Sequence, residues 1–210
     1  MAKLSVDCLL LIFNELTDEK NFLHSCLLVN KEWCNIVVPI LWKKHSYTYL
    51  WLGIGEFNKS DKKFKKIINT ILSCLPSSSN QLLSDNDIKL PSTIFLKAPL
   101  FNYISFCKFP NAETIHGIVN MVFGHNFNPE NSKEKLLEQE VYKLFVSQCK
   151  NGKYLWWKTS QPLSLFPGAS TCFSQLCTLC INIDIANSST LYEMAQICKD
   201  LNELAIDNCY

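Results

Sequence analysis

The first forty residues contain three apolar stretches separated by short polar interruptions. "LSVDCLLLIFNEL" (4–16) and "FLHSCLLV" (22–29) predict two short helices, and residues 31–38 predict a third that Pro39 ends. A surface helix usually has an apolar stripe about 100° wide, and the first helix is too apolar all round for that. Three such helices cannot bury all of this surface alone, so the pattern predicts a partner protein or a docked domain.

Residues 62–75 predict an amphipathic helix, because apolar residues recur at helical spacing from Phe64 to Leu75. Five lysines between positions 59 and 66 accompany it, and they are interpreted as a solvated polar face. Binding to nucleic acid or nuclear targeting is the alternative. "PSSSNQLLSDND" (76–87) is interpreted as a short polar connection, and "STIFL" (92–96) and "NYISF" (102–106) as short strands.

The last fifty residues contain an internal repeat. Leu176, Leu179 and Ile181 are each followed 25 positions later by a residue of the same type, in the pattern L-x-x-L-x-I. A helix is expected between the copies, with a capping box formed by Thr190 and Glu193. Upstream, residues 133–149 predict a helix and "KYLWW" (153–157) a strand, in which Leu155 precedes Leu179 by 24 positions. "AETIHGIVNMVF" (112–123) predicts a still earlier helix.

These repeats resemble leucine-rich repeats of the cysteine-containing class, in which parallel strands stack and each unit covers the apolar face of its neighbour. Cys209 would then lie where the chain turns out of the last strand. The alternative is a chance likeness between two amphipathic segments of an ordinary α/β fold. Because the chain stops at Tyr210, directly after a strand, the repeat region is expected to be truncated or its last face covered.

Charge and cysteine content limit the classes of protein to which this chain is expected to belong. The 210 residues include 20 basic and 19 acidic side chains, so the net charge of +1 gives no general attraction to nucleic acid or anionic membrane. No apolar run reaches the roughly 20 residues that span a bilayer, and a cytoplasmic or nuclear protein is expected. Most of the eleven cysteines lie in apolar patterns and predict buried thiols. Cys172, Cys177 and Cys180 lack a fourth ligand at zinc-site spacing, so packing is favoured over a metal site.

Motifs for catalysis are missing from the sequence. The six glycines form no phosphate-binding loop, and the four histidines belong to no catalytic pattern. The sequence therefore predicts neither an enzyme nor a cofactor or metal ligand set.

The N-terminal segment resembles an F-box, whose pattern runs from a Leu-Pro entry through Ile-Phe and Val-Cys-Lys-x-Trp to Leu-Trp. The matching residues, in order, are Leu4, Asp7, Leu9, Ile12, Phe13, Leu16, Val29, Lys31, Trp33, Leu41 and Trp42. Ser5 stands where the family has Pro, and Asn30 where Cys is common.

The resemblance implies binding to a Skp-family adaptor and, through it, to a cullin-RING ubiquitin ligase. The residues expected to bind the adaptor are Leu4, Ser5, Asp7, Leu9, Ile12, Val29 and Trp33. Phe13, Leu16 and Leu27 are expected to hold the three helices together.

The sequence thus predicts an α+β protein with an F-box over residues 1–45, a helical connecting region over 46–90 and a leucine-rich-repeat-like region over 91–210. The function implied is that of the substrate receptor of an SCF-type ligase, which binds the adaptor at one end and a target protein through the repeats. The alternative is a repeat scaffold, or an adaptor-binding protein, that takes no part in ubiquitin transfer.

Overall fold

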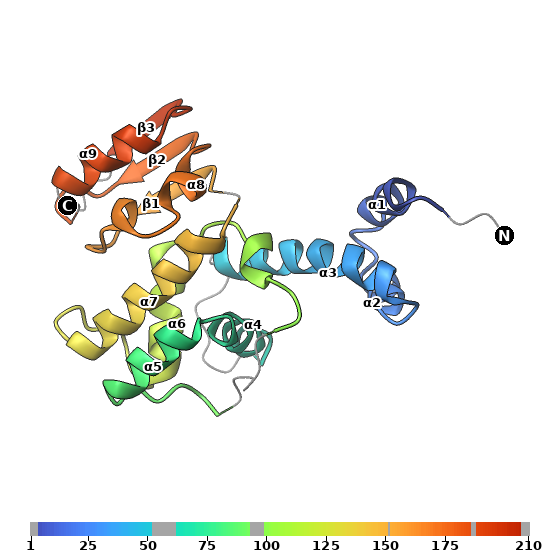
Figure 1. Ribbon diagram of the computed structural model, residues 1–210, viewed down its shortest axis with the longest axis horizontal. Coiled ribbons are helices and arrows are strands. Elements are labelled where there is room, and N and C mark those ends of the chain that lie inside the picture. The colour runs from blue at the N-terminus through green and yellow to red at the C-terminus, as the bar shows by residue number, and fades with distance from the viewer. Residues whose placement is uncertain (1–3, 52–61, 93–98, 151, 186–187, 207–210) are drawn as a thin grey trace.

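The computed structural model describes residues 4–51, 62–92, 99–150, 152–185 and 188–206. Helices form most of this part of the chain, and a three-stranded parallel sheet lies near its C-terminal end. Figure 1 shows the sheet at one end of the long axis and the first two helices at the other, with α3 between them. The α+β class predicted from the sequence is confirmed.

Three helices form the N-terminal unit: α1 (Val6–Glu15), α2 (Lys20–Cys26) and α3 (Lys31–Ser46). The three-helix prediction is confirmed, but the predicted end at Pro39 is wrong, because α3 continues through this residue for two more turns. A proline inside a helix costs about 3 kcal/mol. Packing before and after Pro39 offsets that cost, since Ile36, Val37 and Leu41 are buried against α1 and α2.

The C-terminal end of α3 belongs to a different core. The indole Nε1 of Trp42 donates to Sγ of Cys107 at 3.2 Å, and the Trp42 ring lies 4.6 Å from that of Tyr103. The helix continues directly into a π-helical turn, η1 (Tyr47–Trp51). A single helix therefore joins the N-terminal unit to the body of the protein, across the boundary predicted at residue 45.

The body is built from helices α4 (Lys62–Ser73), α5 (Ser77–Asp85), α6 (Ala112–Phe123) and α7 (Ser132–Gln148) and the 3-10 turn η2 (Tyr103–Phe106). The helices predicted over 62–75, 112–123 and 133–149 are confirmed. The polar connection predicted over 76–87 is wrong, because it forms α5, whose Ser79 is buried and donates to Glu140 at 2.6 Å.

The strand predicted at "NYISF" is also wrong. The Asn102 side chain accepts from the backbone N–H of Ser105 at 3.2 Å, and the Ser105 hydroxyl donates to the Asn102 carbonyl at 2.7 Å. These short-range bonds hold the segment in a 3-10 turn instead of a strand. Most of the strand predicted at 92–96 lies outside the described residues.

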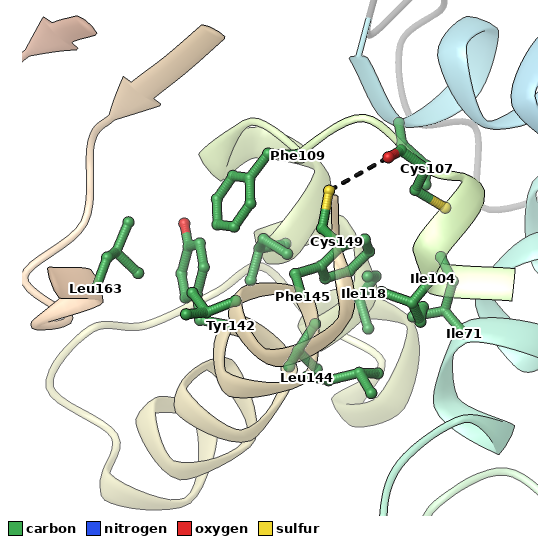
Figure 2. Close-up of a cluster of buried hydrophobic side chains, with 14 of the residues drawn as sticks. Ile71, Ile104, Cys107, Phe109, Ile118, Tyr142, Leu144, Phe145, Cys149 and Leu163 are labelled. Atoms are coloured by element: carbon green, nitrogen blue, oxygen red, sulfur yellow. Dashed lines mark hydrogen bonds between the residues drawn. The ribbon is translucent and has the colours of Figure 1, made fainter. Parts of the chain in front are cut away.

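Helix α7 lies at the centre of the main core. Tyr142, Leu144 and Phe145 are each at most 2% exposed, and Figure 2 shows them among side chains from α4, α6 and η2. At the end of the helix, Sγ of Cys149 donates to the Cys107 carbonyl at 3.2 Å, drawn as a dashed line in Figure 2. Buried residues therefore occur on more than one side of α7.

The sheet consists of β1 (Tyr154–Trp157), β2 (Thr178–Ile181) and β3 (Glu203–Ile206), in that order and all parallel. Its register pairs Leu155 with Leu179 and Leu179 with Leu204, so the 24- and 25-residue spacings and the strand at 153–157 are confirmed. Leu155 and Leu179 are buried, whereas Leu204 is 57% and Ile206 59% exposed. The apolar side of β3 is therefore uncovered in the part of the chain that the structure describes.

The connections between strands differ from each other. The turn η3 (Leu163–Leu165) and the short helix α8 (Ala169–Phe173) join β1 to β2, and α9 (Ser188–Ile197) joins β2 to β3. The predicted capping box is wrong, because Thr190 lies inside α9 and is buried. Its backbone carbonyl accepts from the Ser164 hydroxyl at 2.9 Å, which ties α9 to η3. The predicted turn residue Cys209 lies outside the described residues.

Candidate partner-binding surface

The three N-terminal helices have a compact core of their own. Phe13 is 1% exposed and Leu23 and Val37 are fully buried. The ring of Trp33 meets Phe13 edge to face, with 5.1 Å between centroids. Leu16 and Leu27 pack at the edge of the same cluster, so the residues expected to hold the helices together do so.

A large apolar surface remains outside this core. We call it the N-terminal apolar surface and define it by the exposed residues Leu4, Val6, Leu10, Leu11, Ile12, Phe22, Leu28 and Val29. Leu11 is 69% and Leu28 89% exposed. The helices α1 and α2 that carry most of this surface lie at the end of the molecule opposite the sheet (Figure 1). Many exposed large apolar side chains on one small helical unit are typical of a protein–protein interface.

The residues expected to contact a partner fall into three groups. Leu4, Ile12 and Val29 belong to the N-terminal apolar surface. Ser5 and Asp7 lie exposed at the start of α1, next to it. Leu9 is 3% exposed and packs in the three-helix core, so the structure places it beneath the N-terminal apolar surface and not on it.

Trp33 is half-buried against Phe13, so only one side of its ring can face a partner. Sequence reasoning did not name Leu10, Leu11, Phe22 or Leu28, which are exposed members of the N-terminal apolar surface. The available signal was the all-round apolar character of "CLLLIF", because a helix in a three-helix unit can bury only one stripe.

Ser5 begins α1 as its N-cap. Its hydroxyl accepts from the backbone N–H of Cys8 at 3.3 Å, and Asp7 adds a negative charge to the positive end of the helix dipole. The backbone φ of −67° at Ser5 also suits proline, but proline would remove this capping bond.

We therefore expect Ser5→Ala to lower the free energy of unfolding by about 1 kcal/mol, while Ser5→Asp, which retains a capping oxygen, stays close to the wild-type value. Chemical denaturation of the three proteins measures the difference. Equal stability of the alanine variant would show that this cap does not stabilise α1.

The main core also contains three buried glutamates that the sequence did not reveal. Glu134, Glu138 and Glu140 of α7 are each at most 4% exposed. The Glu138 carboxylate accepts from the Thr159 hydroxyl at 2.9 Å and from the Gln161 amide at 2.8 Å. Burial of a carboxylate is costly unless donors surround it, and here the donors come from distant segments that local sequence does not place together.

Two histidines lie beside these carboxylates. Nε2 of His116 is 3.5 Å from Glu138 Oε1, and its ring stacks on Phe127 at 4.3 Å. Nε2 of His125 is 3.7 Å from Glu134 Oε1, a buried oxygen that has no hydrogen bond. Each pair thus joins a buried carboxylate to a histidine that is partly or largely exposed, at the edge of the core.

The buried thiols are poor nucleophiles. Burial raises the pKa of Cys107 to about 12 and that of Cys74 to about 11. The pKa of Cys172 is also raised, first by its hydrogen bond with Cys149 and then by burial. Cys107, Cys149 and Cys172 thus pack as small apolar groups, as their pattern predicts. Within the described ranges, no three His, Cys, Asp or Glu side chains are grouped so that they could hold a metal ion.

Comparisons with protein-family models, with curated proteins and with solved structures gave no significant match. In the part of the chain that the structure describes, no helix is both long enough and apolar enough to cross a membrane.

Proposed function

We propose that the protein is a substrate receptor of an SCF-type ubiquitin ligase, with residues 4–46 acting as an F-box. The observation that carries this proposal is the N-terminal apolar surface on a unit whose own core is already complete. Leu11 and Leu28 add nothing to that core, and keeping such residues in water gives the isolated unit no stability. A Skp-family adaptor that covers them would explain their exposure.

The C-terminal units support the second half of the proposal. Three parallel strands offset by 24 and 25 residues fit a short leucine-rich-repeat-like stack. The side chains that alternate with the buried leucines, such as Tyr154 and Trp156 of β1, are about half exposed and available to a target protein.

Helix α3 physically connects the N-terminal unit to the body that carries the sheet. Leu41 packs in the N-terminal core and its neighbour Trp42 against the main core, so one helix links both. A receptor of this kind needs no chemistry of its own. It raises the effective concentration of target lysines near the ubiquitin-conjugating enzyme. A continuous helical link between the two cores would keep the distance between adaptor and target fixed.

Copurification tests the proposal directly. The full chain, tagged at its C-terminus and expressed in eukaryotic cells, is expected to capture a Skp-family adaptor together with a cullin. Capture of the adaptor without a cullin would favour an adaptor-binding scaffold with no role in ubiquitin transfer. If the chain captures no adaptor from cells and purified adaptor does not bind the purified chain, the F-box proposal is wrong.

A further inference from the structure

Strand β3 lies at the edge of the parallel sheet, and among the described residues no strand pairs with its outer side. The backbone N–H of Glu203 donates to the Cys177 carbonyl at 3.0 Å, so the backbone groups of Glu203 point toward β2. Successive residues of a strand point their backbone groups to opposite sides, and those of Leu204 and Ile206 therefore point outward. We call these two residues, backbone and side chain, the β3 edge. Such an edge is a template for a further strand.

The side chains of the β3 edge form an open apolar surface. Leu204 and Ile206 are paired in register with Leu179 and Ile181, so all four lie on the same side of the sheet. Leu179 and Ile181 are 4% and 6% exposed, and they share the main core with Met194 of α9. Leu204 and Ile206, in contrast, are 57% and 59% exposed. An added strand with apolar side chains on this side would bury both residues.

The unit that carries the β3 edge is acidic. Residues 182–206 contain four acidic side chains (Asp184, Glu193, Asp200 and Glu203) and one basic side chain (Lys199), a net charge of −3 within a chain whose total is +1. All four acidic residues are exposed. Asp200 lies directly before β3 and Glu203 begins it, where its carboxylate accepts from the neutral hydroxyl of Thr178 at 3.2 Å. Negative charge is therefore placed beside the apolar surface of the edge strand.

This charge selects among the possible occupants of the β3 edge. A second copy of the chain that met the edge through the same unit would bring two net charges of −3 together, which repel each other. A basic segment is attracted instead. Glu203 and Leu204 are successive residues and face opposite sides of the sheet, so a complementary strand needs Lys or Arg on one side and apolar residues on the other.

We propose that the β3 edge binds an extended segment of a target protein in which apolar residues alternate with Lys or Arg, and that this segment pairs with β3 as a fourth strand. The inference rests on the proposed role of the C-terminal half in recruiting a target. Hydrogen bonds to the outward backbone groups of Leu204 and Ile206 hold the segment, and its alternating side chains give the specificity.

The test uses the purified full chain and a displayed library of random short peptides. We expect selection to enrich peptides with alternating apolar and basic residues, and their affinity to fall as the salt concentration rises. Ile206→Ser and Glu203→Lys should each weaken a selected peptide at least about tenfold. The matched controls are Leu82→Ser on α5, which lies away from the sheet in Figure 1, and Glu130→Lys between α6 and α7. Both controls change exposed residues and should leave the affinity unchanged.

The backbone pairing is tested on the peptide, so that the protein itself is unchanged. N-methylation of alternate residues removes the N–H donors on one side of the bound strand. Methylation of the residues whose N–H groups face β3 should weaken binding at least about tenfold, and methylation of the intervening residues should have little effect. Equal effects of the two methylation patterns would show that the peptide does not bind as an added strand.

Selection without basic enrichment, or equal affinity of the edge variants and their controls, would overturn the inference. A concentration-dependent dimer that Ile206→Ser abolishes would also overturn it and identify a second copy as the occupant. Adaptor capture is measured on the same variants, because the sheet lies at the end of the molecule opposite the N-terminal apolar surface (Figure 1). Lost peptide binding with adaptor capture intact isolates the β3 edge, whereas failure of the wild-type chain to capture adaptor contradicts only the F-box proposal.

Discussion

Leu179→Ala is expected to lower the free energy of unfolding by about 2–5 kcal/mol, whereas Leu204→Ala lowers it by less than about 1 kcal/mol. The two leucines occupy equivalent positions in neighbouring strands and are paired in register. Leu179 is 4% exposed in the middle strand, so its truncation leaves a cavity. Leu204 is 57% exposed on the edge strand, where water already reaches the side chain.

Urea denaturation of the full chain measures both changes, and Leu155→Ala serves as a second buried position, since Leu155 is 1% exposed. Amide hydrogen exchange should agree, with faster exchange in β3 than in β2, because an edge unit has one neighbour instead of two. Equal losses of stability at Leu179 and Leu204 would show that the apolar side of β3 is covered in solution.

The second large effect is expected at the N-terminal apolar surface. Leu28→Asp should weaken binding to a Skp-family adaptor by about 2 kcal/mol or more, roughly 30-fold, because the interface would bury an unpaired carboxylate. Leu11→Asp should act in the same direction. Neither substitution should unfold the protein, since both side chains are mostly in water in the free chain.

Leu100→Asp is the matched control. Leu100 is 87% exposed, almost the same as Leu28 at 89%, but it lies outside the N-terminal apolar surface. Titration of the purified variants against the adaptor gives the affinities, and thermal melting reports on the fold. If Leu28→Asp binds as well as Leu100→Asp, this surface does not contact the adaptor.

Local periodicity in the sequence determined most of the secondary structure. The spacing of apolar residues placed the helices at 62–75, 112–123 and 133–149. The repeat also predicted the register of the sheet, because strands at a fixed period present the same residue type at the same position. This is why Leu155, Leu179 and Leu204 align.

Packing and specific hydrogen bonds decided the structure at the positions where they conflict with local propensity. Pro39 ends a helix in isolation, but the contacts that α3 makes with two separate cores carry the helix past it. In "NYISF", the short-range bonds of Asn102 and Ser105 overrode the β propensity of the apolar residues. Propensity is a small energy per residue, and a few packed side chains or hydrogen bonds exceed it.

For the candidate surface, too, the sequence determined one part and only the structure determined the other. The sequence alone showed that the first forty residues are too apolar to bury themselves, and therefore that a partner surface should exist. Only the structure separated the buried Leu9 from the exposed Leu10 and Leu11, because the rotation of α1 against α2 and α3 selects which stripe faces inward. The contacts of the Lys108 ammonium with the rings of Tyr47 and Tyr154 were invisible in the sequence, since these three residues are brought together only by folding.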